Sequence, residues 1–249
     1  MKKTTSILLT VLSLFLLSGC VGMTQQLQAD ATPSITPTPS EMQISHNGIT
    51  YGVVTSPYSS RVWLDKNIGA KNICSSLDDK ACYGDYYQWG RGFDGHQKST
   101  SKVSSKKAKS LTKTDASFIV FTQKEHTDWA KIDNDGSLRE AIWSKTDGSA
   151  ICPKGFRVPT IEELKAELFN EETAHIQNNT DAFLSFLKLP SAGNRYGDDA
   201  KMGYPDTWGY YWSSSVEKTD AMGIYFGASK VGFRSGSRTY GRSIRCIEE

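Results

Sequence analysis

The stretch Ala-Cys-Tyr-Gly-Asp-Tyr-Tyr-Gln-Trp-Gly-Arg at residues 81–91 carries the clearest structural signal in the chain. A second stretch of the same kind, Ile-Cys-Pro-Lys-Gly-Phe-Arg-Val-Pro-Thr, follows at residues 151–160. Both combine aromatic side chains with glycines, which suits a domain whose core is filled by large rings and whose chain reverses in tight turns. The expected core rings are Trp89, Phe156, Trp208 and Trp212. The expected turn glycines, with positive φ, are Gly84, Gly90, Gly155 and Gly193.

Three further blocks continue this pattern, at residues 187–195, 211–215 and 241–246. In this order over residues 49–249, the five blocks resemble the Fibrobacter succinogenes major paralogous domain. The chain departs from the family at Phe156, where the usual residue is tryptophan. The resemblance implies a C-type-lectin-like fold, shared with formylglycine-generating enzymes and with the variable proteins of diversity-generating retroelements. It implies no established activity.

Arginines stand beside apolar residues in several of these blocks. An unpaired buried guanidinium is costly, so we expect them to be paired with acids such as Asp85. The arginines in question are Arg157, Arg195 and Arg245.

Length and charge limit the class of protein. The chain has 249 residues, enough for one large domain or two small ones. Its 29 basic and 27 acidic side chains leave a formal charge of +2, which argues against a general nucleic-acid binder. A hydrophobic content of 38% argues against a chain that is disordered throughout.

The N-terminus has the pattern of a bacterial lipoprotein signal. Lys2 and Lys3 precede a short apolar run at residues 7–17, which is shorter than a membrane-spanning helix requires. The run ends in Leu-Ser-Gly-Cys, which resembles a lipobox and predicts cleavage after residue 19 and acylation of Cys20. The alternative is an ordinary secretory signal with an incidental cysteine. No aspartate follows Cys20, so we expect the outer membrane of the cell envelope.

Beyond Cys20 the sequence predicts a tether and then one domain. Residues 20–44 are rich in proline, threonine and serine, which cannot bury enough apolar surface to fold, so we expect a disordered tether. Residues 45–249 form the expected single domain. Removal of residues 1–19 deletes two lysines and no acidic residue, which leaves 27 basic and 27 acidic side chains. The lipid, rather than charge, would therefore hold the protein at the membrane.

The four remaining cysteines predict two disulfides. An even number in an exported chain favours disulfide bonding, with three possible connectivities. We expect Cys74 to pair with Cys82 and Cys152 to pair with Cys246. A zinc site is the alternative, but the spacings are not those of zinc ligands, and we expect no metal and no cofactor. The four histidines are scattered, and we expect them to be solvent-exposed or to make single hydrogen bonds.

Short apolar runs and one capping box predict an α+β class, with two helices, short antiparallel strands and much irregular loop structure. Thr160 and Glu163 form the capping box, which predicts a helix start. The second helix is expected over residues 181–187, before Pro190. The expected strands lie at residues 49–54, 61–64, 118–122, 210–214, 223–226 and 243–247.

Two irregular segments between the blocks are the candidate ligand-binding regions. Residues 194–208 and 227–242 are rich in tyrosine, serine, glycine and arginine, a composition that resembles antibody paratopes. The alternative is an ordinary polar loop in each case. In retroelement-diversified proteins, variation would fall at residues 222–242. The candidate ligand-binding residues are Tyr196, Tyr204, Asp206, Lys230, Phe233, Arg234, Ser235, Ser237, Arg238 and Tyr240.

These features favour a surface-displayed, non-catalytic lipoprotein that binds a glycan or a protein. One alternative is an enzyme of the formylglycine-generating type, which would need reactive thiols. Another is a structural envelope lipoprotein. No triad, carboxylate pair or His-rich metal pattern is present in the sequence, and the calcium-binding triplets of C-type lectins are missing. We therefore expect no catalytic residues, and the sequence leaves the ligand and the oligomeric state open.

Cys20→Ser should leave the protein unprocessed or release it from the outer membrane, because the cysteine supplies the lipid attachment. Membrane fractionation with metabolic palmitate labelling measures this. Normal membrane retention of an unlabelled variant would contradict the lipoprotein assignment.

Overall fold

The computed structural model describes residues 42–121, 128–170 and 175–249. All of them belong to one compact unit, Pro37–Glu249. The expected signal peptide, Cys20 and the tether up to residue 41 lie outside the described residues. Among the described helices, none is long and apolar enough to cross a bilayer.

The described part of the chain consists mostly of short β-strands with three α-helices, consistent with the expected α+β class. The helices are α1 (Ser137–Trp143), α2 (Ile161–Leu168) and α3 (Asn179–Leu184). Lys80–Cys82 forms one turn of 3-10 helix.

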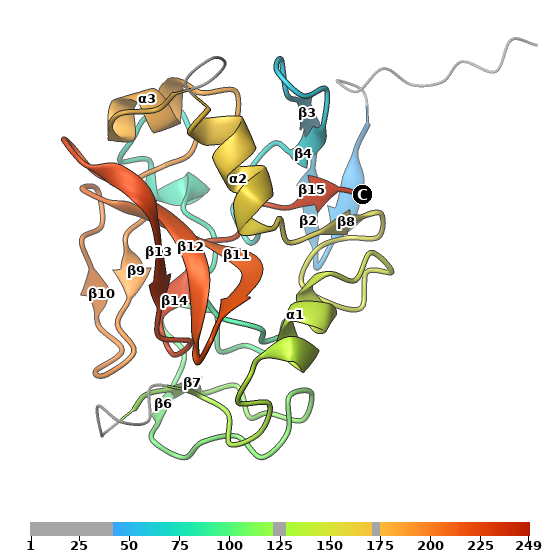
Figure 1. The fold of residues 1–249 in the computed structure, drawn as a ribbon, viewed down its shortest axis with the longest axis vertical. Coiled ribbons are helices and arrows are strands. Elements are labelled where there is room, and N and C mark those ends of the chain that lie inside the picture. Colours follow the sequence, from blue (N-terminus) through green and yellow to red (C-terminus); the bar gives the residue numbers. More distant parts are fainter. Residues whose placement is uncertain (1–41, 122–127, 171–174) are drawn as a thin grey trace, which may run out of the picture. The chain divides into compact units, whose positions relative to one another are not determined.

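Three sheets organise the domain. The first has the order β3 (Val53–Thr55), β4 (Val62–Leu64), β15 (Ile247–Glu248), β8 (Phe156–Arg157). The second has the order β10 (Met202–Gly203), β9 (Asn194–Arg195), β14 (Gly241–Arg242), β5 (Tyr87–Gln88). The third has the order β11 (Gly209–Glu217), β12 (Asp220–Phe226), β13 (Val231–Gly236). Ile247 of the last strand pairs with Trp63 of β4, so the two ends of the domain meet in one sheet (Figure 1).

Two smaller pairs complete the strands. β1 (Ile44–His46) and β2 (Ile49–Tyr51) form an antiparallel hairpin. β6 (Val103–Ser104) and β7 (Phe118–Ile119) pair in parallel.

Most of the expected strands are present, but three expectations are wrong. The segment 194–208, expected as irregular, contains β9 and β10. The segment 243–247 is part of a named strand only at its last residue, because its backbone bonds in turn to β11 at Ser243, to Ile68 at Ile244 and to β4 at Cys246, and forms no continuous ladder with any one of them. The segment 227–242, expected as irregular, contains β13 and β14. β13 pairs along its whole length with β12, from Val231 opposite Phe226 to Gly236 opposite Ala221. Its two glycines hide the strand signal, because glycine has low β-propensity.

The capping box is confirmed, and the second helix is shorter than expected. Thr160 accepts the N–H of Glu163, and the Glu163 carboxylate accepts the N–H of Thr160. Helix α3 stops at Leu184 because Ser185 is extended, with ψ 164°. Leu187 is buried outside the helix, whereas Leu184 is exposed. α1 was not expected, since its N-cap Gly136 makes no side-chain capping bond.

Large aromatic side chains fill the core. The tryptophans that are fully buried are Trp63, Trp89, Trp129, Trp143 and Trp212. Phe156 is also buried. The expectation that Trp89, Phe156 and Trp212 are core rings is therefore confirmed. The expectation for Trp208 is wrong, because its ring is only half-buried and stacks on Tyr210 at the edge of the third sheet.

Both expected disulfides are present in the structure. Cys74 bonds Cys82 across a separation of 8 residues, and Cys152 bonds Cys246 across a separation of 94. The second pair lies in the main core cluster with Trp89 and Trp212. It fixes the C-terminal strand against the middle of the chain.

The four expected turn glycines all have positive φ, between 68° and 88°. Gly90 is also held by packing. A Cβ at this position would lie 2.4 Å from the Cβ of Arg139, so no other residue fits without moving that buried side chain.

Replacing both Cys152 and Cys246 with alanine should cost about 4–5 kcal/mol of unfolding free energy, because the disulfide closes a long loop. The control pair Cys74→Ala and Cys82→Ala closes a short loop and should cost roughly 2–3 kcal/mol on the same chain-entropy relation. Denaturant unfolding measures both. Equal losses for the two pairs would contradict the loop-length explanation.

Candidate functional site

Buried arginines are the dominant polar feature of the domain. In the part of the chain that the structure describes, six guanidinium groups are almost completely inaccessible to solvent. They belong to Arg91, Arg139, Arg195, Arg238, Arg242 and Arg245. Five of these side chains have hydrogen-bond partners, and one does not.

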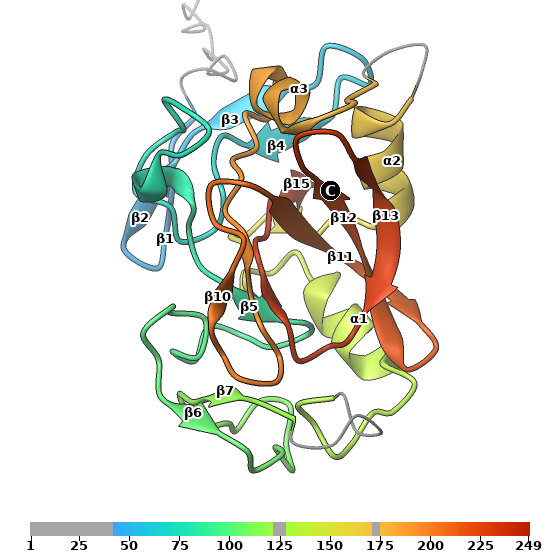
Figure 2. The same ribbon diagram turned by 90° about the vertical axis from the view of Figure 1, so that its left-hand side faces the viewer.

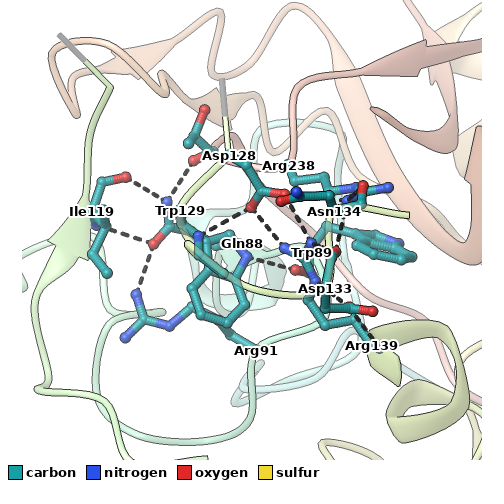
Figure 3. Close-up of polar contacts among 12 residues, drawn as sticks. Gln88, Trp89, Arg91, Ile119, Asp128, Trp129, Asp133, Asn134, Arg139 and Arg238 are labelled. Carbon is teal, nitrogen blue, oxygen red and sulfur yellow. Dashed lines mark hydrogen bonds and ion pairs between the residues drawn. The ribbon is translucent and has the colours of Figure 1, made fainter. Parts of the chain in front are cut away.

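Arg139 and Arg238 share the carboxylate of Asp128 (Figure 3). Arg139 bonds both oxygens of Asp128, at 2.7 and 2.8 Å, and its Nε bonds Asp133 at 2.9 Å. Arg238 bonds Asp128 at 3.1 Å and the backbone carbonyls of Asn134 and Lys218 at 2.9 and 2.8 Å. The two arginines therefore tie residues 128–135 to the third sheet.

This arrangement corrects the expectation for Arg238. It was expected in an exposed loop as a ligand-binding residue, but its side chain is 0% exposed. Its guanidinium lies 5.0 Å from the centre of the Trp89 ring, and that of Arg139 lies 5.5 Å from the same ring. Arg238 is therefore part of the scaffold beneath the surface.

A second buried network adjoins Trp129 (Figure 3). Arg91 lies 5.2 Å from the Trp129 ring and bonds Asp94 and the side-chain oxygen of Gln88, both at 2.7 Å. Gln88 in turn bonds the carbonyl and the N–H of Ile119, at 2.7 and 3.0 Å. The network holds β5 beside β7.

His96 extends this network as a neutral group. Its Nε2 accepts the backbone N–H of Gln88 at 3.1 Å, so the proton is on Nδ1, which donates to Asp94 at 2.5 Å. Burial lowers the pKa of His96 to about 4. The expectation that every histidine is exposed or makes a single hydrogen bond is therefore wrong for His96.

Arg195 and Arg245 are buried without acidic partners, which corrects the expected pairing. Arg195 bonds the carbonyls of Lys98, Ala200 and Ser101, at 2.9, 2.9 and 3.0 Å. Arg245 bonds the Leu187 carbonyl at 2.6 Å and the Asn67 side chain at 3.0 Å. Loop carbonyls thus replace the expected carboxylates.

Arg157 is paired with an acid, as expected, although that acid is not Asp85. Arg157 bonds both carboxylate oxygens of Glu163, at 2.8 and 2.7 Å. Asp85 is paired with Lys98 at 2.8 Å.

Arg242 is the exception among the buried arginines. It is 3% exposed, and its Nε has no hydrogen-bond partner within the described chain. No carboxylate among the described residues lies within ion-pair distance of it; Asp220 contributes only a longer-range attraction. Burial, and then the charge of Arg234, lower its pKa to about 9, so the group is still cationic at neutral pH.

Aromatic rings surround the Arg242 guanidinium. It lies 3.8 Å from the centre of the Trp212 ring and 5.7 Å from those of Tyr210 and Tyr240. Space for it comes from Gly223 and Gly236, where a Cβ would lie 3.0 and 2.4 Å from its terminal nitrogens. Cation–π contact therefore stabilises this buried charge in place of hydrogen bonds.

Contacts between aromatic rings extend from Arg242 across the third sheet. Tyr240 contacts Tyr196, and Tyr196 contacts Tyr204, with ring centres 6.1 and 6.3 Å apart. In the other direction Trp208 lies 6.2 Å from both Tyr210 and Tyr225. Arg234 lies 5.2 Å from the Tyr225 ring. We call this set the aromatic–arginine cluster: Tyr196, Tyr204, Trp208, Tyr210, Tyr225, Arg234, Tyr240 and Arg242.

The cluster gathers side chains from several strands and loops. β12 and β13 contribute Tyr225 and Arg234, and β14 contributes Arg242. Tyr196 directly follows β9 and Tyr204 directly follows β10, and a bridge between Gly193 and Gly209 joins this hairpin to β11. Arg234 and Tyr204 are exposed, the latter at 54%, whereas Trp208, Tyr225 and Tyr240 are half-buried.

The pKa values of two tyrosines reflect this crowding. Desolvation, followed by a hydrogen bond with Tyr204, raises the pKa of Tyr196 to about 12. Desolvation also raises the pKa of Tyr210, while the charges of Arg234 and Arg242 oppose that rise. The Tyr210 hydroxyl and the two guanidiniums therefore belong to one electrostatic unit.

The candidate residues predicted from the sequence do not all meet at this cluster. Tyr196, Tyr204, Arg234 and Tyr240 do. Phe233 is on the opposite face of β13, where the Lys165 ammonium of α2 lies 4.1 Å from its ring.

Four other candidates lie apart from the cluster. Ser235 is in register with Met222, which packs toward α2. Lys230 is exposed in the turn between β12 and β13. Asp206 accepts a hydrogen bond from Tyr83, and the Ser237 hydroxyl bonds Thr239 at 2.6 Å.

Sequence reasoning missed Tyr210, Tyr225 and Arg242 as site residues and assigned Trp208 to the core. The alternation of apolar side chains along residues 220–226 was the available signal for Tyr225. In a strand it places Tyr225 on the face of the sheet that Ile224 and Phe226 do not share. Arg242 falls within a scaffold block, and no local pattern distinguishes it from Arg238 or Arg245.

The cysteines that the enzyme hypothesis would use as thiols, Cys152 and Cys246, form a buried disulfide. No group of three or more potential metal ligands occurs within residues 42–121, 128–170 and 175–249. Comparison with protein families, with curated proteins and with solved structures finds no match to this chain.

Arg238→Ala should lower the unfolding free energy by roughly 3–5 kcal/mol, because it removes one cation of a buried ion network and leaves loop carbonyls without a donor. Lys230→Ala is the control, since an exposed substitution usually changes stability by no more than about 0.5 kcal/mol. Thermal or denaturant unfolding measures both. A loss for Arg238→Ala as small as that of the control would show that the buried network does not stabilise the fold.

Proposed function

We propose that this chain is a non-catalytic ligand-binding lipoprotein whose binding surface is the aromatic–arginine cluster. The observation that carries the proposal is the gathering of tyrosine, tryptophan and arginine side chains on one face of the third sheet, where the buried Arg242 has no ion pair and its Nε has no hydrogen-bond partner among the described residues. These three residue types supply most of the binding energy in protein interfaces.

The physical properties of the cluster suit recognition. Tyrosine and tryptophan offer a large contact area at low conformational cost, because each has few rotatable bonds. Neighbouring rings already hold these side chains in place: Tyr196 lies between Tyr204 and Tyr240, and Trp208 lies between Tyr210 and Tyr225. A surface fixed before binding loses less entropy when a ligand arrives.

We further propose that the domain has a C-type-lectin-like fold of the Fibrobacter succinogenes major paralogous type. The positions of the sequence blocks support this. Trp89, Cys152, Trp212 and Cys246 come from four separate blocks and pack in one core cluster. Such a shared core would leave the segments between the blocks free to differ in their ligand contacts.

The proposal includes display at the bacterial cell envelope. Its basis is the signal-like N-terminus, the lipobox cysteine Cys20 and the proline-rich segment before residue 45. Two disulfides agree with an oxidising compartment. A lipid at Cys20 and an extended tether would present the domain away from the membrane.

Binding variants test this function. Tyr204→Ala and Arg234→Ala, alone and together, should weaken binding to the ligand found on a glycan array or on intact cells. We expect at least one of them to cost about 2 kcal/mol, which is about a 30-fold loss of affinity. Their melting temperatures should stay within a few degrees of the parent, because both side chains are exposed.

Phe233→Ala is the matched control, since Phe233 is equally exposed but faces α2 on the other side of the same strand. It should leave binding unchanged. Equal loss of binding in Phe233→Ala and Arg234→Ala would place the binding surface elsewhere.

A further inference from the structure

We infer that the aromatic–arginine cluster recognises a carboxylate, and that the carboxylate is part of an acidic glycan built from uronic acid units. This inference rests on the proposed binding function and adds the chemical class of the ligand. Its basis is an uncompensated positive charge beneath and beside a set of aromatic rings.

Two guanidinium groups meet at the cluster without an acidic partner. The ion pairs of the described residues include neither Arg234 nor Arg242. The two cations are close enough for Arg234 to lower the pKa of Arg242. Like charges in a partly buried site repel one another strongly, because the surroundings screen them poorly. An anion near both groups would relieve that repulsion.

Another pair of neighbouring arginines in the domain does have an acidic partner. Arg139 and Arg238 are also neighbours, but Asp128 lies between them and bonds both, at 2.7 and 3.1 Å. Arg242 and Arg234 have no such carboxylate. The anion that Asp128 supplies within the scaffold would be supplied at the cluster by the ligand, and Arg favours carboxylates because its planar fork matches two oxygens.

The rings beside these cations favour a sugar as the carrier of the carboxylate. The C–H faces of a pyranose ring pack against aromatic faces, and its hydroxyls bond phenols and guanidiniums. Tyr204 is exposed, and Trp208 and Tyr225 are half-buried on the same face as Arg234. The cluster therefore offers ring faces and a cation side by side.

An acidic peptide fits this face less well. Extended peptides commonly bind by adding a strand to a free sheet edge, through main-chain hydrogen bonds. A free edge of this sheet is β13 (Figure 2), whereas Tyr210 and Tyr225 of the cluster come from β11 and β12. The main chain of β12, beneath the cluster, already pairs with β11 and β13. The face itself thus presents side chains and few main-chain groups.

Paired ligands with and without carboxylates test the inference. The probes are polygalacturonate, alginate and hyaluronan, each beside its carboxyl-reduced form, with hexaglutamate as the peptide probe. The protein is the chain from residue 21, which lacks the predicted lipid attachment at Cys20, and affinity is measured by calorimetry or by quenching of tryptophan fluorescence. At least one polyuronate should bind tenfold or more tightly than its carboxyl-reduced form, and added salt should weaken it.

Two variants connect that preference to the site. Arg234→Gln should lose tenfold or more in affinity for the polyuronate and little for any neutral glycan. Arg242→Met should lose affinity in the same way while its melting temperature stays equal or rises, because an apolar side chain replaces a buried charge that has no partner. A gain in stability with a loss of binding is the mark of a residue kept for function.

Each contrary outcome has a separate meaning. Equal binding of the acid and reduced forms would overturn the carboxylate while leaving the ligand-binding function in place. Binding of hexaglutamate without any polyuronate would overturn the glycan. A strong fall in the melting temperature of Arg242→Met would show that its charge is compensated and would remove the basis of the inference. Failure of all probes would also overturn it, whereas the array and cell assays test the binding function independently.

Discussion

The burial of guanidinium groups is the constraint on which the rest of this structure depends. A domain of short strands and long loops leaves many backbone carbonyls without a partner in regular secondary structure, and a buried carbonyl needs a donor. Arginine supplies five donors from one side chain. Arg195 and Arg245 each bond carbonyls of separate loops, and Arg238 connects residues 133–135 to residue 218. The loops are held by side chains where a larger protein would use helices and sheets.

Aromatic rings complete this arrangement and also connect it to the surface. Trp89 and Trp129 lie against the guanidiniums of the interior, as Trp212 lies against Arg242. The same pairing of ring and cation therefore appears in two settings. Inside the domain each cation also has oxygen partners. At the aromatic–arginine cluster those partners are absent from the described chain, and in this respect the proposed binding surface differs from the scaffold, which has a similar composition.

Some features of the site follow from alternation along a strand. Arg234 and Phe233 are adjacent in sequence and both exposed, yet they belong to opposite faces of β13. A composition rich in tyrosine, arginine and serine pointed to residues 194–208 and 227–242, which contain most members of the aromatic–arginine cluster. Composition could not separate the two faces of β13, because its two glycines conceal the strand, and only the register of the strand shows which side chains share a face.

What the sequence determined by itself was local or chemically distinctive. The capping box at Thr160, the positive φ of four glycines, the two disulfides and three of the four expected core rings were predictable, because each depends on a few neighbouring residues or on strong apolar and cysteine chemistry. Only the tertiary structure decided which buried arginines have hydrogen-bond and ion-pair partners. Arg238 and Arg242 are four residues apart, but Arg238 finds its carboxylate 110 residues away in sequence and Arg242 finds none in the described chain. The partner of a buried charge is set by the long-range path of the chain, which no local pattern encodes.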